Sequence, residues 1–402
     1  MKRLGWAAVL IAGLSFSASA ETLTLGFFQS STDNLFQTSL PEKDYLSNLA
    51  FAFEKSFAPL SFFSRGNYSY LSKNTGVSAY AQEAGLDYVR ALSEKTALYL
   101  AVKAEGTIYR EAYKDFNFLS FGLAAAAKSY LMEGSILKLN YDLDYKDYRL
   151  SVFDSLSHYA TASLDRYFET KTTLRADLNW GYKTFFHPYA DEPVSPGDSP
   201  AYQSGLGVMG HAGGPGGGNS LGGGPMGRRK GLVRQGSPGQ GQGIQVISLS
   251  GLAAQGIGDR LGLRVSGLRQ WTLSGKNPFS SIEEFYLIEN PSSDVFSWNG
   301  HSLAAQLTVE IPWDIQLKLG YTRSRKEFPG IDALDMEGLS LGMLRQDTRN
   351  QWEARLEKNF RSLSVYLNYT SVDNRSNGLL FDWRGHFLTA GVEWNINWGA
   401  RE

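Results

Sequence analysis

Acidic and basic side chains recur at every second position in several stretches of this sequence. Asp142 and Asp144 form one such pair, and Glu353, Arg355 and Glu357 form a second run. Carboxylates paired on one face could exchange protons in acid–base catalysis, whereas a row of charges could line a pathway for ions. The sequence brings no second catalytic element near either run, so we interpret both as wall charges.

Two of the five histidines have a serine beside them. Ser157 precedes His158, and Ser302 follows His301. A hydrolase needs serine, histidine and an orienting acid to converge, but adjacent residues of a strand point to opposite faces. We therefore expect no enzymatic activity.

Composition excludes several other classes of protein. The 402 residues include 39 basic and 40 acidic side chains and no cysteine. A nearly neutral chain lacks the basic surface that nucleic-acid binding requires. Without cysteine there is no disulfide, thiol catalysis, iron–sulfur cluster or c-type haem attachment, and we expect no cofactor.

Residues 1–20 have the pattern of a cleaved signal peptide. Lys2 and Arg3 precede an apolar run, and Ala18-Ser19-Ala20 precede Glu21, as expected at a cleavage site. The apolar run is too short to span a membrane as a helix. We expect a mature chain of residues 21–402, exported to the periplasm.

After residue 20 the hydropathy alternates with a period of two, which predicts β-strands. Residues 136–146 place leucine and tyrosine on one face and lysine, asparagine and aspartate on the other. Sixteen segments show this behaviour: 22–29, 45–56, 60–72, 77–91, 96–110, 116–130, 135–147, 154–168, 171–186, 244–256, 260–273, 296–311, 314–327, 345–359, 362–374 and 385–398.

The connections between these segments alternate between short turns and longer loops, and both termini fall on the short-turn side. Aromatic residues collect near segment ends, as in the girdles of membrane barrels. The segments also exceed the usual length of strands in soluble sandwiches. We therefore predict an all-β fold: a transmembrane, antiparallel, up-and-down β-barrel of about sixteen strands in the bacterial outer membrane.

A barrel of this size is wide enough to enclose an aqueous channel. The alternation assigns eighteen charged residues to the lumen: Arg65, Glu83, Asp87, Lys103, Glu105, Lys138, Asp142, Asp144, Asp165, Arg175, Asp177, Lys183, Arg264, Lys318, Glu353, Arg355, Glu357 and Glu393. These ten acids and eight bases predict weak ion selectivity. They could instead form ion-pair networks that fill the barrel.

Residues 187–243 differ from the rest of the chain because they are rich in proline and glycine. Such a composition cannot bury enough apolar area to offset the entropy of ordering, which predicts an extracellular loop. Alternatively, the segment could fold into the lumen and gate it through Arg228, Arg229, Lys230 and Arg234, or separate two half-domains. Its Met209, His211 and Met226 are too scattered to predict a metal site.

The region from Arg345 to Asn377, including Ser364-Val365-Tyr366-Leu367-Asn368-Tyr369, resembles the last hairpins of outer-membrane β-barrel porins of Gram-negative bacteria. Val392, Trp394, Ile396 and Trp398 resemble the final strand that such proteins present to the barrel assembly machinery. The chain departs from that pattern by adding residues 399–402 after the last aromatic. Related barrels also include export proteins, so the resemblance implies a fold more than a function.

Together these features predict a porin-like channel for the diffusion of small solutes or ions. The alternative is a non-conducting or plugged barrel that acts as a scaffold or export partner in an outer-membrane assembly. Expected partners are outer-membrane lipid and, during insertion, the barrel assembly machinery. A surface or periplasmic protein could bind loops 274–295 and 328–344, which include the apolar residues Phe279, Phe285, Tyr286, Leu287 and Phe328.

Overall fold

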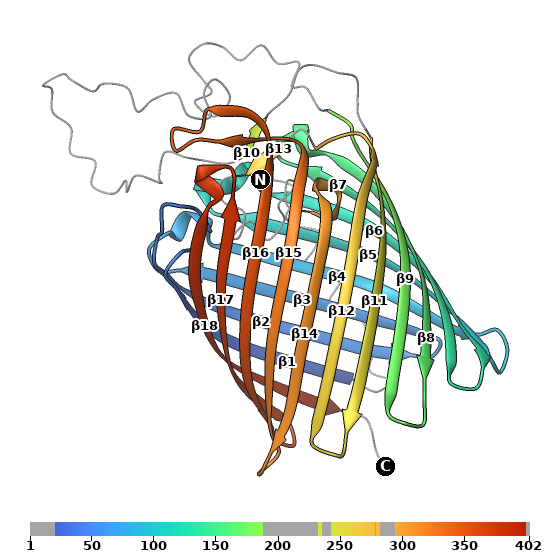
Figure 1. The fold of residues 1–402 in the computed structure, drawn as a ribbon. Coiled ribbons are helices and arrows are strands. Elements are labelled where there is room, and N and C mark those ends of the chain that lie inside the picture. Colours follow the sequence, from blue (N-terminus) through green and yellow to red (C-terminus); the bar gives the residue numbers. More distant parts are fainter. Residues whose placement is uncertain (1–20, 188–231, 235–242, 278, 282–293, 399–402) are drawn as a thin grey trace, which may run out of the picture.

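Sixteen antiparallel strands form one closed barrel in the computed structural model, which describes residues 21–187, 232–234, 243–277, 279–281 and 294–398. The first and last strands pair from Glu21 with Trp398 to Thr32 with Phe387, and this pairing closes the sheet. Figure 1 shows the strands inclined to the barrel axis. The predicted fold class and strand number are confirmed.

The barrel strands follow chain order around the sheet. They are β1 (Glu21–Thr32), β2 (Asp44–Phe57), β3 (Leu60–Leu71), β4 (Ala79–Ala91), β5 (Thr96–Tyr109), β6 (Phe118–Met132), β7 (Ser135–Tyr148), β8 (Ser155–Tyr167), β9 (Thr172–Phe185), β11 (Ile244–Ile257), β12 (Leu261–Ser274), β14 (Asn299–Ile311), β15 (Ile315–Leu334), β16 (Ser340–Asn359), β17 (Leu363–Ser376) and β18 (Trp383–Trp398). Two short strands, β10 (Leu232–Arg234) and β13 (Phe279–Ser281), pair in a separate sheet.

The two ends of the barrel differ in their connections. At one end, called the turn end, tight turns join neighbouring strands, as where Phe168 N–H donates to Thr172 O at 2.9 Å between β8 and β9. At the other, the loop end, longer segments carry five short 3₁₀ helices: η1 (Thr75–Val77), η2 (Glu111–Phe116), η3 (Ser151–Phe153), η4 (Val295–Ser297) and η5 (Leu379–Phe381). Figure 1 shows the turns at the bottom and the loops at the top.

The connection 328–344 is a correction to the sequence prediction, which made it a loop. β15 continues to Leu334 and β16 begins at Ser340, and Asp335 N–H donates to Leu339 O at 3.0 Å across the turn. Burial of Ile331 and Leu334 stabilises this extension. The register shifts after Glu327, which interrupts the alternation on which the sequence prediction rested.

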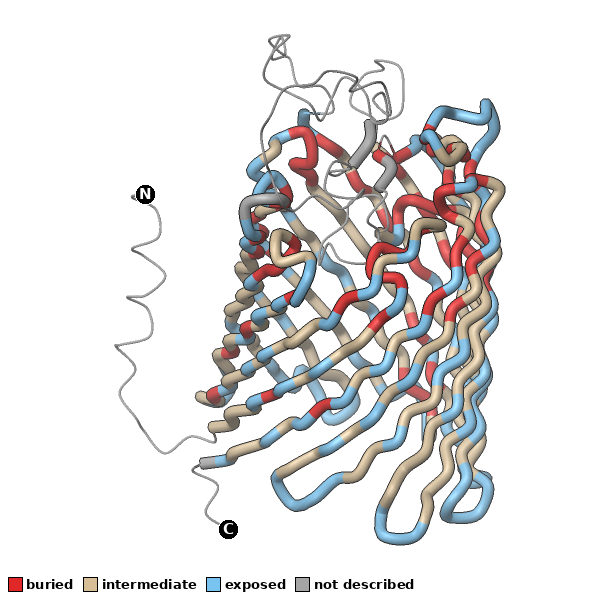
Figure 2. The backbone as a smooth tube through the Cα atoms, turned by 90° about the vertical axis from the view of Figure 1, so that its left-hand side faces the viewer, coloured by how far each residue is buried: buried red, intermediate tan, exposed pale blue. Residues whose placement is uncertain are grey.

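The main apolar core lies inside the loop end. One cluster combines loop residues, such as Phe36 and Phe153, with strand-end residues from β3, β4, β5, β6, β7, β9 and β11. Side chains from strands so widely spread around a closed sheet can meet only on its concave side. Figure 2 shows the buried positions gathered toward the loop end. The loops therefore fold inward against the wall and narrow the mouth of the barrel.

The opposite side of the sheet, the outer face, is apolar through its middle. Leu49, Leu100, Leu139 and Leu303 are exposed there. Most charged residues of this face lie toward the strand ends, whereas Arg269, Arg323 and Arg325 lie farther from them, on β12 and β15. Charges at the midplane of a bilayer would each cost about 2–4 kcal/mol. This distribution fits a surface that faces lipid. Among the described residues, no helix is long and apolar enough to cross a membrane.

Candidate functional site: the charged interior wall

The strand register places all eighteen of the charged residues selected from the sequence on the concave side, here called the interior face. Arg65 pairs with Glu83, and Glu83 pairs with Glu105. Directly paired residues point to the same face of the sheet, so the assignment of one strand fixes that of the next. Tyr109 and Phe118, which belong to the buried interior cluster, lie on this same face. That solutes meet these charges stays a prediction.

One ion-pair network lies on β3, β4 and β5. Glu83 accepts from Arg65 at 3.2 Å and from Lys103 at 3.1 Å. Nearby, Tyr99 Oη donates to Asp87 at 2.7 Å. Each cation sits directly beside a strand that carries a carboxylate, because cross-strand neighbours on one face lie within reach of each other.

A second network centres on Asp165 of β8, whose side chain is fully buried. Lys138 Nζ lies 2.6 Å from Asp165 Oδ2, and Arg175 donates to the carboxylate through Nε at 2.5 Å and Nη2 at 3.3 Å. Asp177 accepts from Ser250 Oγ at 2.9 Å. The buried carboxylate thus joins three neighbouring strands.

A third network lies across the sheet on β15 and β16. Glu357 accepts from Lys318 at 3.5 Å and from Arg355 at 3.0 Å. The guanidinium of Arg355 also lies 4.1 Å from the centroid of the Tyr366 ring, close enough for a cation–π contact. This network holds Arg355 against the wall.

Four of the predicted interior charges form no such pair. Asp142, Arg264, Glu353 and Glu393 have no hydrogen bond or ion pair with any residue that the structure describes. Arg264 and Glu353 are nevertheless exposed. Charges that are neither paired nor desolvated must be hydrated, because an unpaired buried charge is strongly unfavourable.

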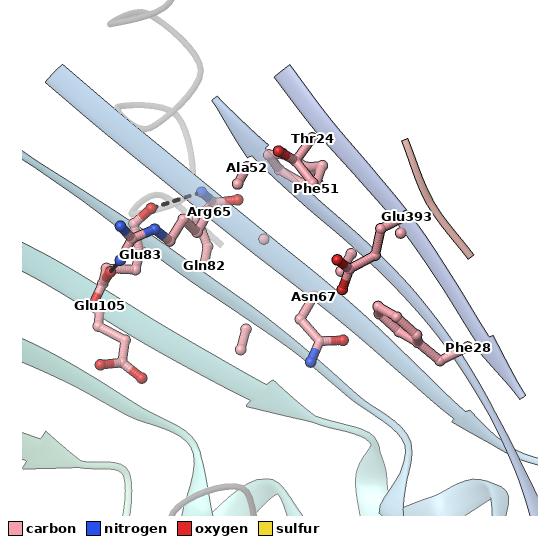
Figure 3. A pocket seen from close by; sticks show the side chains of 14 residues that line it. Thr24, Phe28, Phe51, Ala52, Arg65, Asn67, Gln82, Glu83, Glu105 and Glu393 are labelled. Carbon is pink, nitrogen blue, oxygen red and sulfur yellow. Dashed lines mark hydrogen bonds and ion pairs between the residues drawn. The ribbon is translucent and has the colours of Figure 1, made fainter. Parts of the chain in front are cut away.

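A hollow of about 340 Å³ lies on the interior wall between β1 and β5. Figure 3 shows Arg65, Glu83 and Glu105 on one side of it, with Glu393, Asn67 and Phe28 across from them. Three carboxylates therefore line the hollow with one guanidinium, and one of the three, Glu83, also pairs with Lys103. This arrangement favours contact with a hydrated cation over contact with an anion.

Partial exposure distinguishes this wall from a filled barrel interior. Arg65 is 60% exposed, Lys103 40% and Arg175 38%, although all three point inward. Packed interiors leave few voids larger than a water molecule, so a filled barrel would bury such side chains. The ion pairs hold side chains along the wall while water reaches them.

Several interior charges were missed in the sequence interpretation: Asp44, Glu54, Lys128, Lys146, Glu310, Lys326, Arg345, Asp347 and Arg349. Most lie near strand ends. Extending the alternation to those ends would have found them, because residues an even number of positions apart share a face, as Arg345 and Glu353 do. Lys128 follows the run Ala124–Ala127, which has no hydropathy contrast. These residues bring the two signs of charge nearer to balance.

Of the four basic residues of the candidate loop gate, the structure describes only Arg234. Arg228, Arg229 and Lys230 lie outside the described residues, as do Met209, His211 and Met226. The backbone of Arg234 belongs to β10 and pairs with Phe279 of β13. Phe279 is buried and lies 4.7 Å from Phe153 and 5.1 Å from Phe185, centroid to centroid. One described piece of the Gly-rich segment therefore adjoins a strand anchored at the inner rim.

Two of the apolar residues proposed as a partner surface have a different role. Phe279 and Phe328 are buried among the chain's own side chains, so they cannot contact a partner protein. Arg345 packs on the Phe328 ring at 4.4 Å and pairs with Asp347 at 2.5 Å. Phe285, Tyr286 and Leu287 lie outside the described residues.

The two histidines that neighbour a serine point to the opposite face of the sheet from that serine, as expected for adjacent residues of a strand. His158 faces outward with its Nδ1 2.7 Å from Tyr141 Oη, and His301 faces outward beside Arg269. Their neighbours Ser157 and Ser302 lie on the interior face. Within the described residues, no group of three metal-ligating acids or histidines forms a cation site.

No protein-family model matches this chain, and no curated protein matches it in sequence. Among solved structures, OccAB1 of Acinetobacter baumannii has a TM-score of 0.51 at 10% identity, covering 94% of this chain and 97% of that one. OpdO of Pseudomonas aeruginosa has a TM-score of 0.50 at 10% identity, covering 94% and 97%.

The outer membrane protein OpdK from Pseudomonas aeruginosa also matches with a TM-score of 0.50 at 10% identity, covering 94% of this chain and 99% of that one. At such low identity, these likenesses show a shared fold. The expected resemblance to outer-membrane barrels therefore holds at the level of the fold, without a matching sequence family.

Proposed function

We propose that this chain is an outer-membrane channel through which small solutes or ions diffuse. The observation that carries the proposal is the exposed interior wall: inward-pointing Arg65, Lys103 and Arg175 keep more than a third of their side-chain surface exposed inside a closed sixteen-strand barrel. Barrels of 16–18 strands are wide enough for an aqueous path, whereas eight strands leave room only for side chains.

The outer face supports a location in the outer membrane. This face carries exposed aromatic residues, among them Trp352, Trp394 and Phe121, and most of its charges lie toward the strand ends. An even number of strands with short turns at one end and longer loops at the other is typical of bacterial outer-membrane barrels. We infer that the loop end faces outward and the turn end faces the periplasm.

The wall should filter solutes by size and weakly by charge. Acids and bases alternate around it, and most are neutralised in pairs, so the interior has no strong field of either sign. The hollow beside Glu393 is locally acidic. We therefore expect modest cation preference and no tight binding site, consistent with diffusive passage.

A plugged scaffold is the second candidate, and the loop end is the observation that favours it. Apolar residues of several loops pack inside the mouth, including Phe36, Phe116 and Phe296. Such packing narrows the entrance. In this alternative the barrel serves as a folded platform for an outer-membrane assembly, with the Gly-rich segment completing the obstruction.

Conductance in a planar bilayer distinguishes the two candidates. The mature chain, residues 21–402, is compared with a variant that lacks residues 203–231 and keeps β10. The channel proposal predicts discrete current steps from the intact protein. Steps that occur only after the deletion would favour the plugged barrel. Silence from both proteins, each with the circular dichroism of a folded sheet, would contradict the channel.

A further inference from the structure

The outer face carries a groove of about 470 Å³ that the channel does not use. Outward residues of β9, β11, β12 and β14 line it: Ala176, Leu249, Gly251, Gly267, Arg269, His301 and Leu303. Its floor follows one row of the sheet, in which Ala176 pairs with Gly251, Gly251 with Gly267, and Gly267 with Leu303. Three small residues in succession make the hollow.

The hollow is open to the surroundings over Gly251, whereas Leu303 Cδ2 lies 3.2 Å from where a Cβ would stand at Gly267. A Cβ added at Gly251 would approach only the Arg175 carbonyl oxygen, at 3.8 Å, within the residues described. Leu249 and Leu303, 53% and 61% exposed, form apolar sides. An acyl chain could therefore lie directly against the backbone of the sheet here.

Cationic side chains border the groove on the side of the loop end. Arg269 lies two residues beyond Gly267 toward that end, and its Nη1 is 3.4 Å from His301 Nδ1. On the next strand, β15, Arg325 pairs with His301. Arg323 pairs with Leu303, two residues closer to the turn end. Arg269, Arg323 and Arg325 are exposed and form no ion pair with any described residue.

Acidic residues are scarce on this part of the outer face. Of the outward positions described on β9, β11, β12 and β14, and on β15 as far as Glu327, only Glu327 is acidic, and its Oε2 already accepts from Gln346 at 3.0 Å. Among the residues that the structure describes, these arginines therefore have no acidic partner. A ligand that brings negative charge would supply one.

The arginines lie near the loop-side edge of the apolar band. Arg269 follows Leu261, the first residue of β12, by eight positions, which is about 20 Å along the membrane normal for a strand tilted by 40°. The apolar band of such barrels is about 25 Å tall. The Trp271 ring lies 5.5 Å from the Arg269 guanidinium, at a level where aromatic girdles mark the interface.

We propose that this groove binds a phosphate-bearing, acylated lipid of the outer leaflet, such as lipid A. An acyl chain lies over Gly251 and Gly267, while the phosphate is bound by Arg269 and Arg325 beside His301. Guanidinium groups bind phosphate through paired, charge-assisted hydrogen bonds. The inference rests on the outer-membrane location proposed above.

Charge complementarity favours lipid over the other occupants of such a surface. Apolar contacts alone give little preference inside a bilayer, because lipid tails are as apolar as leucine. Unpaired arginines on a lipid-facing surface instead select for anionic head groups. A second copy of this chain would place the same three arginines opposite like charges unless an anion lay between them.

The test measures binding of bis-phosphorylated lipid A to the mature chain in detergent by native mass spectrometry, with phosphatidylethanolamine as the reference lipid. Arg269→Gln/Arg325→Gln removes two cations, and Gly251→Val adds a side chain to the groove at a position where the Cβ lies no closer than 3.8 Å to any described atom beyond its chain neighbours. Arg90→Gln/Lys358→Gln is the matched control, because it removes two outward cations at the turn end.

We expect lipid A to bind in preference to phosphatidylethanolamine, with at least tenfold weaker binding in the arginine variant, several-fold weaker binding in Gly251→Val, and a change within twofold in the control. Equal binding by the wild type and the arginine variant would overturn the proposal. So would equal binding of both lipids, or self-association that the arginine variant abolishes. Conductance in phosphatidylcholine is measured separately: current without lipid A preference refutes this inference alone, whereas preference without current refutes the channel alone.

Discussion

Replacing Asp165 with asparagine should lower the free energy of unfolding by about 2–3 kcal/mol. The buried carboxylate accepts hydrogen bonds from Lys138 at 2.6 Å and from Arg175 at 2.5 and 3.3 Å. Asparagine keeps one acceptor oxygen and removes the charge, so about two charge-assisted bonds of about 1.5–3 kcal/mol each are lost. Lys138 and Arg175 are 31% and 38% exposed, and their rehydration by water in the lumen offsets part of that loss.

The assay is reversible urea unfolding in detergent micelles or lipid vesicles, followed by tryptophan fluorescence. Asp259→Asn is the control: it makes the same substitution in an ion pair, 2.9 Å from Lys171, that lies exposed at the turn end. This pair should contribute little to stability, because water and salt screen two exposed charges. Equal losses from the two substitutions would refute the view that Asp165 is a buried junction of the wall. A loss of 5 kcal/mol or more would refute hydration of its two cations.

Three other changes test separate parts of the structure. Burial raises the pKa of Asp154, against the opposing hydrogen bond from Tyr148 N–H, so its ionised form disfavours the folded state. Asp154→Asn should be more stable than the wild type at pH 7, and the gap in unfolding free energy should close as the pH falls toward 3.8; a constant gap would contradict this. Gly181→Ala places a Cβ 2.7 Å from Phe296 and 3.1 Å from Tyr159 and Val246, so urea unfolding should show a loss of about 1–3 kcal/mol, and no loss would mean that η4 does not pack there. Glu353→Lys/Glu393→Lys reverses two unpaired wall charges and should lower the potassium-over-chloride permeability ratio roughly two- to threefold in 0.1 M salt, measured by reversal potential; an unchanged ratio would place both residues away from the path.

The strands could be predicted from the sequence because each one is a local alternation with one face in lipid. β7 places Leu139 and Tyr141 outward and Asp142 inward, and a shift of one residue would bring every charge of that strand to lipid. The register was therefore fixed by hydropathy contrast. The contrast is absent at Ala124–Ala127, and Lys128 was missed there. It is also interrupted beyond Glu327, where the extension of the β15–β16 hairpin was missed.

The mouth of the barrel could not be predicted in this way. Its packing depends on contacts between residues distant in the chain, such as Phe279 with Phe153 and Phe185. An apolar residue in a loop indicates that its side chain is buried, but it does not indicate which residues cover it. Phe279 was therefore assigned to a surface for a partner protein. The groove at Gly251 and Gly267 was also missed, because it arises only when the register aligns small residues of separate strands.

Cysteine labelling tests the central claim, that the interior face borders an aqueous solute path. The native chain has no cysteine, so Glu353→Cys and Ala354→Cys each introduce a single thiol, on the interior and outer face respectively. A positively charged methanethiosulfonate reagent is added during single-channel recording. The structure predicts a stepwise fall in current for Glu353→Cys and none for Ala354→Cys. No current from the folded protein, or current that the reagent leaves unchanged at position 353, would contradict the channel.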